Sequence, residues 1–277
     1  MGVKVVHISE LDTQISDKPK LVNEFVNTWS VEGCYEECIS PAEMGWGTHE
    51  KTLPANSYVH HSGPKNQICI AQPGAKTWVR SWVPDTQITG MIIRHGEAFT
   101  ISNHLSIWAG DQAIYRPTVH YVYHPTDVAI ASLLELEAQH WKITPKQRIM
   151  NDEITDGEDR LGVLIMGHTY KSWWAGSLLN IHESRKIIPG QSATTVQVAG
   201  AVYAAVAWAI ANPNAGYRVP DDLPWRELLA SAEKYWGGYY SEPVDWSPII
   251  GRNDLFNGWN GRKYDELDPW QFGNFLV

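Results

Sequence analysis

The chain is poor in cysteine and has no large basic cluster. Its 277 residues include three cysteines, Cys34, Cys38 and Cys69, a small and odd number that argues against a disulfide framework and predicts a reduced, cytoplasmic protein. Lysine and arginine number 22 against 31 aspartates and glutamates, so the formal charge is −9. Because nucleic-acid binding requires basic patches, this balance argues against a nucleic-acid partner and favours cationic small molecules.

Several sequence signatures of catalysis are also missing. No G-x-G-x-x-G turn follows a predicted strand, and Gly45-Trp46-Gly47 is only a fragment of that pattern, so the chain alone is not expected to bind NAD by the usual route. The Gly-x-Ser-x-Gly elbow of a serine hydrolase is absent. His120 and His124 have a spacing that suits metal ligands on a helix, but their surroundings predict a strand and offer no third ligand. We therefore expect no metal.

Hydrophobic runs long enough for a membrane are scarce. The longest, residues 196–211, is slightly short and rich in alanine, and we interpret it as a buried helix rather than a membrane span. Thr194 or Thr195 is a suitable N-cap, and the segment Asn212-Pro213 cannot continue a helix. No membrane partner is expected.

The elements that the sequence does contain predict an α+β fold. With 43% hydrophobic residues, the chain is large enough to bury a sizeable core. Strands and helices follow one another without a βαβ rhythm, so we expect a mixed or antiparallel sheet with flanking helices. The aromatic segment Trp270-Gln271-Phe272 is expected to dock on the body. Strands are predicted at residues 3–8, 67–71, 76–83, 88–95, 148–151 and 161–168, and helices at 30–39, after 96, at 126–140 and at 224–236.

The most specific feature is the acidic and aromatic segment 26–50. It holds five glutamates and two tryptophans but neither lysine nor arginine. An alkylammonium ion binds a carboxylate by charge-assisted hydrogen bonds and a tryptophan face by cation–π attraction, the latter contributing about 0.5–2 kcal/mol. Exposed glutamates on a solvated helix explain the same composition equally well. The residues available for such a site are Glu10, Asp12, Trp29, Glu32, Glu36, Glu37, Glu43 and Trp46.

The same segment carries a resemblance to a known family. Asn27-Thr28-Trp29-Ser30-Val31-Glu32-Gly33 and Pro41-Ala42-Glu43-Met44-Gly45-Trp46-Gly47-Thr48-His49-Glu50 closely resemble bacterial homospermidine synthases, which are relatives of saccharopine dehydrogenase. The similarity continues through Tyr115-Arg116-Pro117-Thr118-Val119-His120-Tyr121, Leu161-Gly162-Val163-Leu164 and Pro269-Trp270-Gln271-Phe272. The resemblance implies a fold like the saccharopine dehydrogenase C-terminal domain. It also implies that residues 1–277 are the substrate-binding and dimerisation portion, without the N-terminal NAD-binding Rossmann domain.

The activity implied by the resemblance is an NAD-dependent aminobutyl transfer. Putrescine or spermidine would donate the aminobutyl group. Putrescine would be oxidised to an imine, a second putrescine would displace ammonia, and reduction of the new imine would give homospermidine. The resemblance assigns polyamine contacts to Glu10, Trp29, Glu37 and Asp159, and catalytic roles to Glu37 and His95. A near-neutral pKa suits His95 to carrying protons. The implied partners are polyamines, a second copy in a homodimer, or a separate Rossmann-domain chain.

Two alternative functions remain open at this point. Loss of the NAD-binding half would leave a non-catalytic domain for polyamine binding or assembly. A saccharopine dehydrogenase-like amine oxidoreductase fragment would need basic residues to hold substrate carboxylates, and the segment 26–50 has none. The chain departs from the family pattern at Leu11, where a basic residue is usual, and at Cys34 and Cys38 beside the predicted site.

Overall fold

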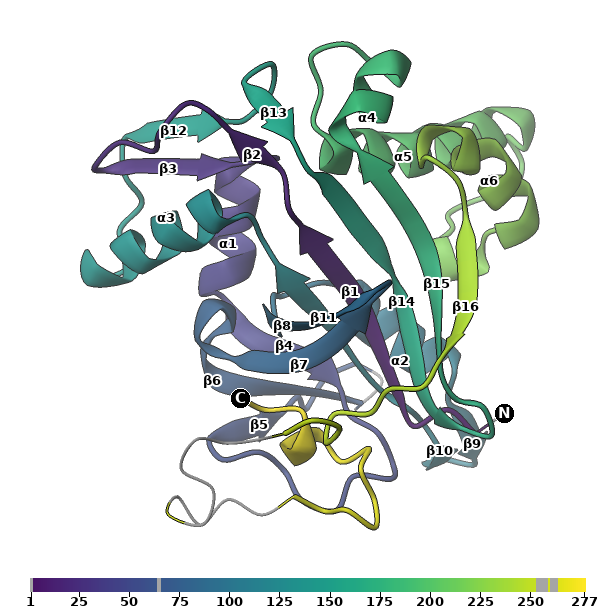
Figure 1. The fold of residues 1–277 in the computed structure, drawn as a ribbon. Coiled ribbons are helices and arrows are strands. Elements are labelled where there is room, and N and C mark those ends of the chain that lie inside the picture. Colours follow the sequence, from purple (N-terminus) through teal and green to yellow (C-terminus); the bar gives the residue numbers. More distant parts are fainter. Residues whose placement is uncertain (1, 64–65, 253–258, 260–263) are drawn as a thin grey trace.

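One large mixed sheet forms the centre of the structure (Figure 1). A computed structural model describes residues 2–63, 66–252, 259 and 264–277. The sheet follows the order β16 (Tyr240–Val244), β15 (Lys171–Asn180), β14 (Glu158–His168), β1 (Val5–Asp12), β11 (Thr118–His124), β4 (Pro41–Gly45), β6 (Gln67–Pro73) and β5 (Ser57–Val59). β8 (Thr86–Met91) also pairs with β11 and carries β7 (Trp78–Val83). Of the described strands in this sheet, only β1 and β11 are paired in parallel, so the predicted mixed-sheet α+β class is confirmed.

Helices and small ribbons surround the sheet. The described helices are α1 (Val31–Ile39), α2 (Glu97–His104), α3 (Asp127–Ala138), α4 (Ile181–Ile187), α5 (Ala193–Ala211) and α6 (Trp225–Ala232). The ribbons pair β9 (Ile107–Ala109) with β10 (Gln112–Tyr115), β3 (Glu24–Asn27) with β12 (Lys146–Ile149), and β2 (Ile15–Ser16) with β13 (Ile154–Asp156). Figure 1 shows α1 and α3 on the opposite side of the molecule from α5 and α6.

Strand β1 lies between β11 and β14 and organises both faces of the sheet. Successive side chains of a strand point to opposite faces, so Glu10 and Asp12 share a face while His7 and Ser9 share the other. The sequence predicted that this strand ends at Ile8, and that prediction is wrong. The strand runs to Asp12 because its backbone stays paired with β14 through the polar residues.

Two hydrophobic layers cover these faces. One packs under α1 and α3 and includes Val6, Phe25, Cys34, Tyr121 and Tyr123. The other packs under β7 and the C-terminal tail and includes Val5, Val79, Val122, Leu164, Trp174, Phe272 and Phe275. The chemistry-bearing side chains of β1 therefore lie inside the molecule and not at a solvated strand end.

Helices α1 and α3 begin where the sequence predicted, directly after Ser30 and Thr126. The Ser30 hydroxyl accepts a hydrogen bond from the Gly33 amide at 3.0 Å, and the Thr126 hydroxyl accepts one from the Ala129 amide at 3.3 Å. Such caps satisfy backbone N–H groups that have no partner within the helix. Because α1 starts directly after Trp29, this cap also fixes where the tryptophan leaves the backbone.

Several predicted boundaries need correction. The strand predicted at 88–95 ends at Met91, because Ile92 leaves the ladder to donate its amide hydrogen bond to Thr77. The strand predicted at 76–83 begins at Trp78, after a 3₁₀ turn over Gly74–Lys76. The helix predicted at 224–236 spans Trp225–Ala232 and continues only as a 3₁₀ turn over Glu233–Tyr235.

Helix α5 differs most from its prediction. Its N-cap is Ser192, whose hydroxyl accepts a hydrogen bond from the Thr195 amide at 3.1 Å. The helix is long and apolar enough to cross a membrane by length and composition, which for a single helix is weak evidence, and 33% of its apolar window is buried. The expectation of a buried helix is therefore wrong for most of its surface. An apolar helix shows no polar face from which its exposed side can be predicted, and the exposed side chains here include Val198, Val202, Tyr203, Val206 and Ile210.

The C-terminal segment docks on the body as predicted. The Gln271 side chain accepts a hydrogen bond from the Lys51 amide at 2.8 Å, and Glu50 accepts one from the Phe272 amide at 2.9 Å. Between α6 and this segment, β16 pairs with β15 and extends the main sheet. Residues 253–258 and 260–263 of this segment lie outside the described part of the chain.

Candidate functional site

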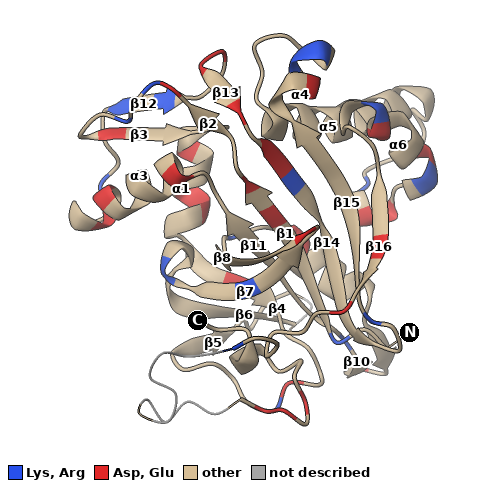
Figure 2. Cartoon of the chain, viewed as in Figure 1, with Lys and Arg blue, Asp and Glu red and all other residues tan. Residues whose placement is uncertain are grey.

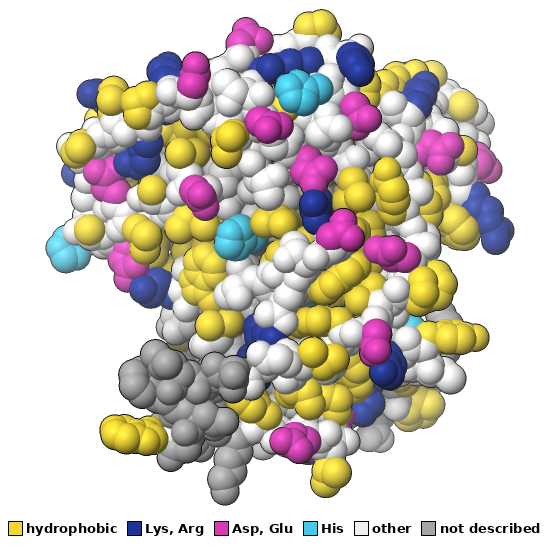
Figure 3. Space-filling view, viewed as in Figure 1, with side chains coloured by type: hydrophobic (Ala, Val, Ile, Leu, Met, Phe, Trp, Pro, Cys, Tyr) yellow, Lys and Arg dark blue, Asp and Glu magenta, His cyan; other side chains and the backbone are white. Residues whose placement is uncertain are grey.

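Three carboxyl groups are buried where β1 meets β14. Glu10 and Asp12 lie on one face of β1, and Asp159 lies opposite Asp12 in the antiparallel pairing. Their exposed fractions are 4%, 2% and 0%. Figure 2 shows acidic residues on these neighbouring stretches of β1 and β14. On the surface in Figure 3, acidic side chains lie among hydrophobic ones over the upper half of the visible face. Buried carboxylates normally need a cation or several hydrogen bonds, so their surroundings determine what they do.

The surroundings disfavour three negative charges. Burial raises the pKa of Glu10 to about 8, and a hydrogen bond from Tyr121 only partly opposes that rise. Burial also raises the pKa of Asp12. The pKa of Asp159 is raised well above its ordinary value by burial and by the charges of Glu10 and Asp12. Of the lysines and arginines that the structure describes, none forms an ion pair with these three groups. The cluster therefore retains protons unless a cation enters.

Of the three carboxyl groups, Asp12 accepts the most hydrogen bonds. It accepts hydrogen bonds from the backbone and side-chain amides of Gln14 at 2.9 and 3.0 Å. The hydroxyl of Thr28 donates to it at 2.5 Å, and that of Thr194 donates at 3.3 Å. By contrast, neither carboxyl oxygen of Asp159 has a hydrogen-bond partner of regular geometry. Asp12 is thus a structural carboxylate, whereas Asp159 is held far less firmly by its neighbours.

Two tyrosines of β11 face the same side as Glu10. The Tyr121 hydroxyl donates a hydrogen bond to Glu10. The Tyr123 hydroxyl accepts a hydrogen bond from the indole nitrogen of Trp29 at 2.9 Å. Trp29 is only partly buried, so it joins an aromatic wall to the carboxyl cluster.

His95 connects this wall to a second acidic group. Its ring lies 4.7 Å from the ring of Tyr121, measured between centroids. Its Nδ1 contacts Glu97, and its Nε2 lies 3.8 Å from a carboxyl oxygen of Glu37. Burial opposes protonation of His95, but the hydrogen bond to Glu97 and the charges of Glu97, Glu37 and Glu10 raise its pKa overall. Burial raises the pKa of Glu37, and His95 opposes that rise. A proton can therefore be held at either end of this contact.

The structure brings the five predicted site residues to one region. Glu10 is electrostatically coupled to His95 and Glu37 and influences the pKa of Asp159. Trp29 joins them through Tyr123, whose neighbour on the same face, Tyr121, lies 6.5 Å away between ring centroids. This proximity does not by itself test their assigned roles.

Other acids of the segment 26–50 lie elsewhere. Glu32 and Glu36 are exposed, as the solvated-helix interpretation predicts. Glu43 contacts Arg94 at 3.1 Å and His60 at 3.4 Å. Trp46 packs against Phe272, 5.7 Å away between ring centroids, in the layer on the other side of the sheet. The expectation that Glu43 and Trp46 could join the site is therefore not met.

Sequence reasoning missed the groups that support the predicted ones. These are Gln14, Glu97, Tyr121, Tyr123 and Thr194. The alternation of Tyr121 and Tyr123 in a strand was a usable signal, because it places both rings on one face. No comparable signal links Thr194 to Asp12, since 182 positions separate them in the sequence.

The metal and disulfide expectations concern other side chains. His120 and His124 lie on strand β11, as the composition around them predicted. No group of three or more metal-ligating side chains occurs within the described ranges. All three cysteines are free, and the sulfurs of Cys34 and Cys38 lie 3.8 Å apart on α1. Residues four apart on a helix share a face, so these two thiols lie side by side on α1.

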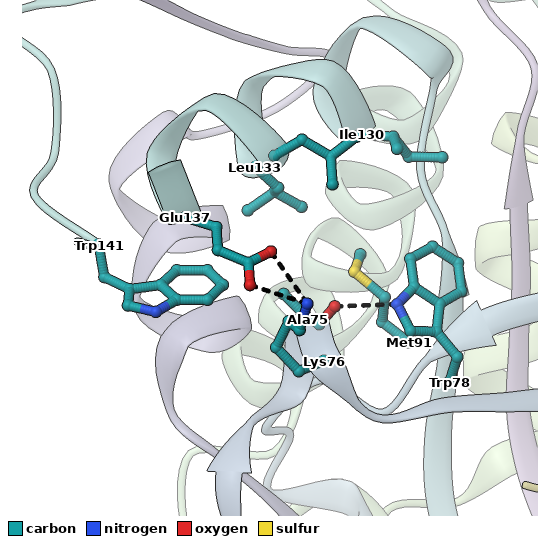
Figure 4. A pocket seen from close by; sticks show the side chains of 9 residues that line it. Ala75, Lys76, Trp78, Met91, Ile130, Leu133, Glu137 and Trp141 are labelled. Atoms are coloured by element: carbon teal, nitrogen blue, oxygen red, sulfur yellow. Dashed lines mark hydrogen bonds and ion pairs between the residues drawn. The ribbon is translucent and has the colours of Figure 1, made fainter. Parts of the chain in front are cut away.

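Two cavities lie outside the carboxyl cluster. One, of about 60 Å³, lies between α3 and the Trp78 and Met91 side chains, and the Lys76–Glu137 ion pair lies at its edge (Figure 4). The other, of about 320 Å³, is open and lies beside the ends of β1 and β14, between Thr13, Glu158 and Asn180.

The Gly45-Trp46-Gly47 segment does not offer a dinucleotide turn. A Cβ at Gly45 would lie 2.3 Å from the Cβ of Ser102, and one at Gly47 would lie 2.7 Å from the Thr118 nitrogen. These glycines allow β4 to pack closely against its neighbours. In the part of the chain that the structure describes, this segment therefore does not fit the phosphates of NAD.

Fold and site together define an α+β domain with a buried, cation-poor carboxyl cluster beside an aromatic wall. Residues 1–237 match the family described as the saccharopine dehydrogenase C-terminal domain, and the chain belongs to this family. It is 44% identical over 279 residues to a homospermidine synthase of Blastochloris viridis, and 43% identical over 282 residues to one of Mesorhizobium japonicum. Each alignment covers 100% of this chain but only 58% and 57% of the respective relatives.

A solved structure agrees with these sequence relatives. The homospermidine synthase from Legionella pneumophila, crystallised in complex with NAD, matches with a TM-score of 0.95 and 40% identity. The match covers 100% of this chain and 60% of that chain. The predicted resemblance to bacterial homospermidine synthases is therefore confirmed, over somewhat more than half of their length.

Proposed function

We propose that this chain is the polyamine-handling portion of a homospermidine synthase. The observation that supports the proposal most directly is the cluster of Glu10, Asp12 and Asp159, which is buried without an ion pair to any described lysine or arginine. A protonated amine supplies the missing positive charge and hydrogen-bond donors. The reaction would join two putrescines into homospermidine with release of ammonia, or transfer the aminobutyl group of spermidine to putrescine with release of 1,3-diaminopropane.

Substrate binding would use the carboxyl cluster and the aromatic wall. One ammonium group of putrescine would bind Asp159 and Glu10, and the Trp29 face would attract a cation by about 0.5–2 kcal/mol. Entry of the ammonium would favour ionisation of Glu10, whose pKa in its absence is about 8. The buried cluster would thus exchange a proton for a cation.

Proton transfer would use Glu37 and His95. An amine must be neutral before it can lose hydride, while the distant amine of the same substrate must stay charged to remain anchored. The raised pKa of Glu37 and its 3.8 Å contact with His95 suit the pair to accept one proton and pass it on. Glu97 would hold the His95 ring in place through its Nδ1.

The proposed cofactor is NAD, which would take up and return the hydride. Its binding is not assigned to this chain, because the glycines that might have held it are required for packing. The nucleotide-binding portion would be a Rossmann domain outside residues 1–277 or a separate chain. We also propose a homodimer, for which the exposed apolar side of α5, with Val198, Val202 and Val206, offers a surface.

Calorimetric titration with putrescine tests the binding proposal. We expect binding that weakens as salt is added, because screening reduces attraction between charges. Trp29→Ala should weaken binding by about tenfold, which corresponds to about 1.4 kcal/mol. Trp225→Ala is the matched control, since Trp225 is 63% exposed on α6. Unchanged affinity in the Trp29→Ala protein would contradict the proposed site.

The non-catalytic alternative has one observation in its favour, the unsuitability of the Gly45-Trp46-Gly47 segment for a dinucleotide. Mixing the chain with a separately expressed Rossmann domain, NAD and putrescine distinguishes the two functions. Formation of homospermidine would support the enzyme. Intact putrescine binding without product would support a binding or assembly domain. The amine oxidoreductase alternative is disfavoured, because the described site has no lysine or arginine for a substrate carboxylate.

A further inference from the structure

Two neighbouring tyrosines of β11 support both kinds of proposed amine contact. We infer that Tyr121 and Tyr123 are positioning residues, Tyr121 for the Glu10 carboxylate and Tyr123 for the Trp29 ring. The inference rests on the proposed function, because it concerns how the same amine site is held in shape. Neither tyrosine needs to touch the amine for this role.

Strand geometry brings the two tyrosines to the site. In the parallel pairing of β1 with β11, Tyr123 lies opposite Glu10 and Tyr121 lies opposite Ile8. Both side chains point to the Glu10 face, because residues two apart in a strand share a side. Tyr121 is 7% exposed and Tyr123 is fully buried. The rigid centre of the sheet therefore holds both hydroxyl groups.

Trp29 lacks comparable support from its own backbone. It lies between the end of β3 and the start of α1, outside any regular element. Its indole N–H donates to Tyr123 at 2.9 Å, and the two rings are tilted by 51° rather than stacked. Because cation–π attraction requires a cation over the ring face, the orientation of the indole matters. The hydrogen bond sets that orientation.

Tyr121 links Glu10 to the histidine of the site. Its hydroxyl donates to Glu10, while its ring packs against His95 on one side and meets Tyr123 nearly at right angles. A carboxylate that accepts a hydrogen bond is favoured in its charged form. Tyr121 therefore holds Glu10 in place and also keeps it easier to ionise.

Glu10 is influenced by groups from every element around it. Asp12 and His95 affect its pKa in opposite directions, and Glu37 raises it. Glu10 in turn affects the pKa of surrounding groups. Those groups are Cys34 on α1, His95, Tyr121 and Tyr123 on β11, and Asp159 on β14. The test of Tyr121 must therefore separate its effect through Glu10 from effects through these neighbours.

The first experiment removes the hydroxyl of Tyr123. Tyr123→Phe should weaken putrescine binding by about two- to tenfold, the range for one net hydrogen bond. In a Trp29→Ala background the same change should have no further effect. Tyr35→Phe is the matched control, because it loses a hydrogen bond to the Trp141 carbonyl in the same hydrophobic layer. An equal loss of affinity in both backgrounds would overturn the inference for Tyr123.

A spectroscopic measurement tests Tyr123 without a ligand. The Trp29 indole N–H can be assigned in nitrogen-resolved proton spectra from its absence in Trp29→Phe. We expect its exchange with solvent to accelerate at least severalfold in Tyr123→Phe and to stay unchanged in Tyr35→Phe. Unchanged exchange in Tyr123→Phe would overturn the inference even if the chain bound no putrescine, an outcome that would separately contradict the proposed function.

The second experiment removes the hydroxyl of Tyr121. Loss of its hydrogen bond should move the pH at which putrescine binding strengthens to a higher value, so affinity should fall more at pH 6 than at pH 9. In a Glu10→Gln background Tyr121→Phe should leave the pH dependence unchanged. A uniform loss at all pH values, or the same shift in the Glu10→Gln background, would overturn the inference for Tyr121. Loss of binding in Trp29→Ala with no effect of either tyrosine would retain the proposed function and reject the positioning role.

Discussion

Asp12 and Asp159 lie directly opposite each other across β1 and β14, yet only Asp12 accepts several hydrogen bonds of regular geometry. Gln14, Thr28 and Thr194 all donate to Asp12. Asp159 faces this negative charge at full burial, and its pKa is raised well above the ordinary value. Such an arrangement stores an unfavourable interaction that an incoming cation relieves.

The two aspartates should respond oppositely to amide substitution. Asp159→Asn should stabilise the free protein, because the neutral amide removes a buried carboxyl group whose pKa is raised well above its ordinary value by burial. Asp12→Asn should destabilise it by about 1–3 kcal/mol, since its donors lose an acceptor in a buried site. Chemical denaturation at pH 7 measures both changes. If Asp159→Asn were destabilising to the same degree as Asp12→Asn, Asp159 would be an ordinary structural residue. Putrescine should stabilise the wild type but not Asp159→Asn.

Putrescine binding should release a proton at pH 7. Glu10 is then mostly protonated, because burial raises its pKa to about 8, whereas a bound ammonium requires the carboxylate. Titration in buffers with different ionisation enthalpies, such as phosphate and Tris, should give different heats, and the difference should correspond to up to about one proton. Glu10→Gln is the control and should abolish the difference. Identical heats in both buffers would contradict a protonated Glu10 in the free protein.

The raised pKa of Glu10 also makes the stability of the ligand-free protein depend on pH. The folded pKa of Glu10 is raised above its ordinary value of 4.5. The contribution of Glu10 to the free energy of unfolding is therefore fully present below pH 4.5. It is lost as the pH rises through 8. The effect opposes the usual rise of stability with pH that hydrogen-bonded carboxylates produce.

Local signals in the sequence predicted local structure well. Ser30 and Thr126 cap their helices as expected, because capping depends on residues within one turn. The polar end of β1 was misread, since the pairing that keeps Glu10 and Asp12 in the strand comes from Tyr123 and Asp159, which are far away in sequence. Strand length was decided by partners and not by local composition.

Composition could not predict which glutamates of the segment 26–50 belong to the candidate site. Glu37 contacts His95, Glu43 contacts Arg94, and Glu50 holds the Phe272 amide. These different contacts depend on packing between residues far apart in the sequence, so the residues next to each glutamate do not predict them. The resemblance to a known family selected Glu37, and the structure places it beside His95, whereas charge alone gave it no advantage over Glu43.

The histidine pair on the opposite face of β1 should make the protein sensitive to acid. His7 and His120 lie 4.3 Å apart between ring centroids and are fully buried. Burial lowers the pKa of His120 to about 4 from its ordinary 6.5. Between these two pH values the unfolded chain binds a proton at His120 that the folded chain does not bind. The contribution of His120 to the free energy of unfolding is therefore fully present above pH 6.5 and is lost as the pH drops toward 4. The difference is about 3 kcal/mol for a shift of this size. The loss of stability between pH 7 and pH 4.5 should be smaller in His120→Phe, which keeps a ring but cannot be protonated, although burial still lowers the pKa of His7 in that variant. His104→Ala is the control, because His104 is exposed on α2. If His120→Phe lost as much stability on acidification as the wild type, the acid sensitivity would have to arise from groups other than His120.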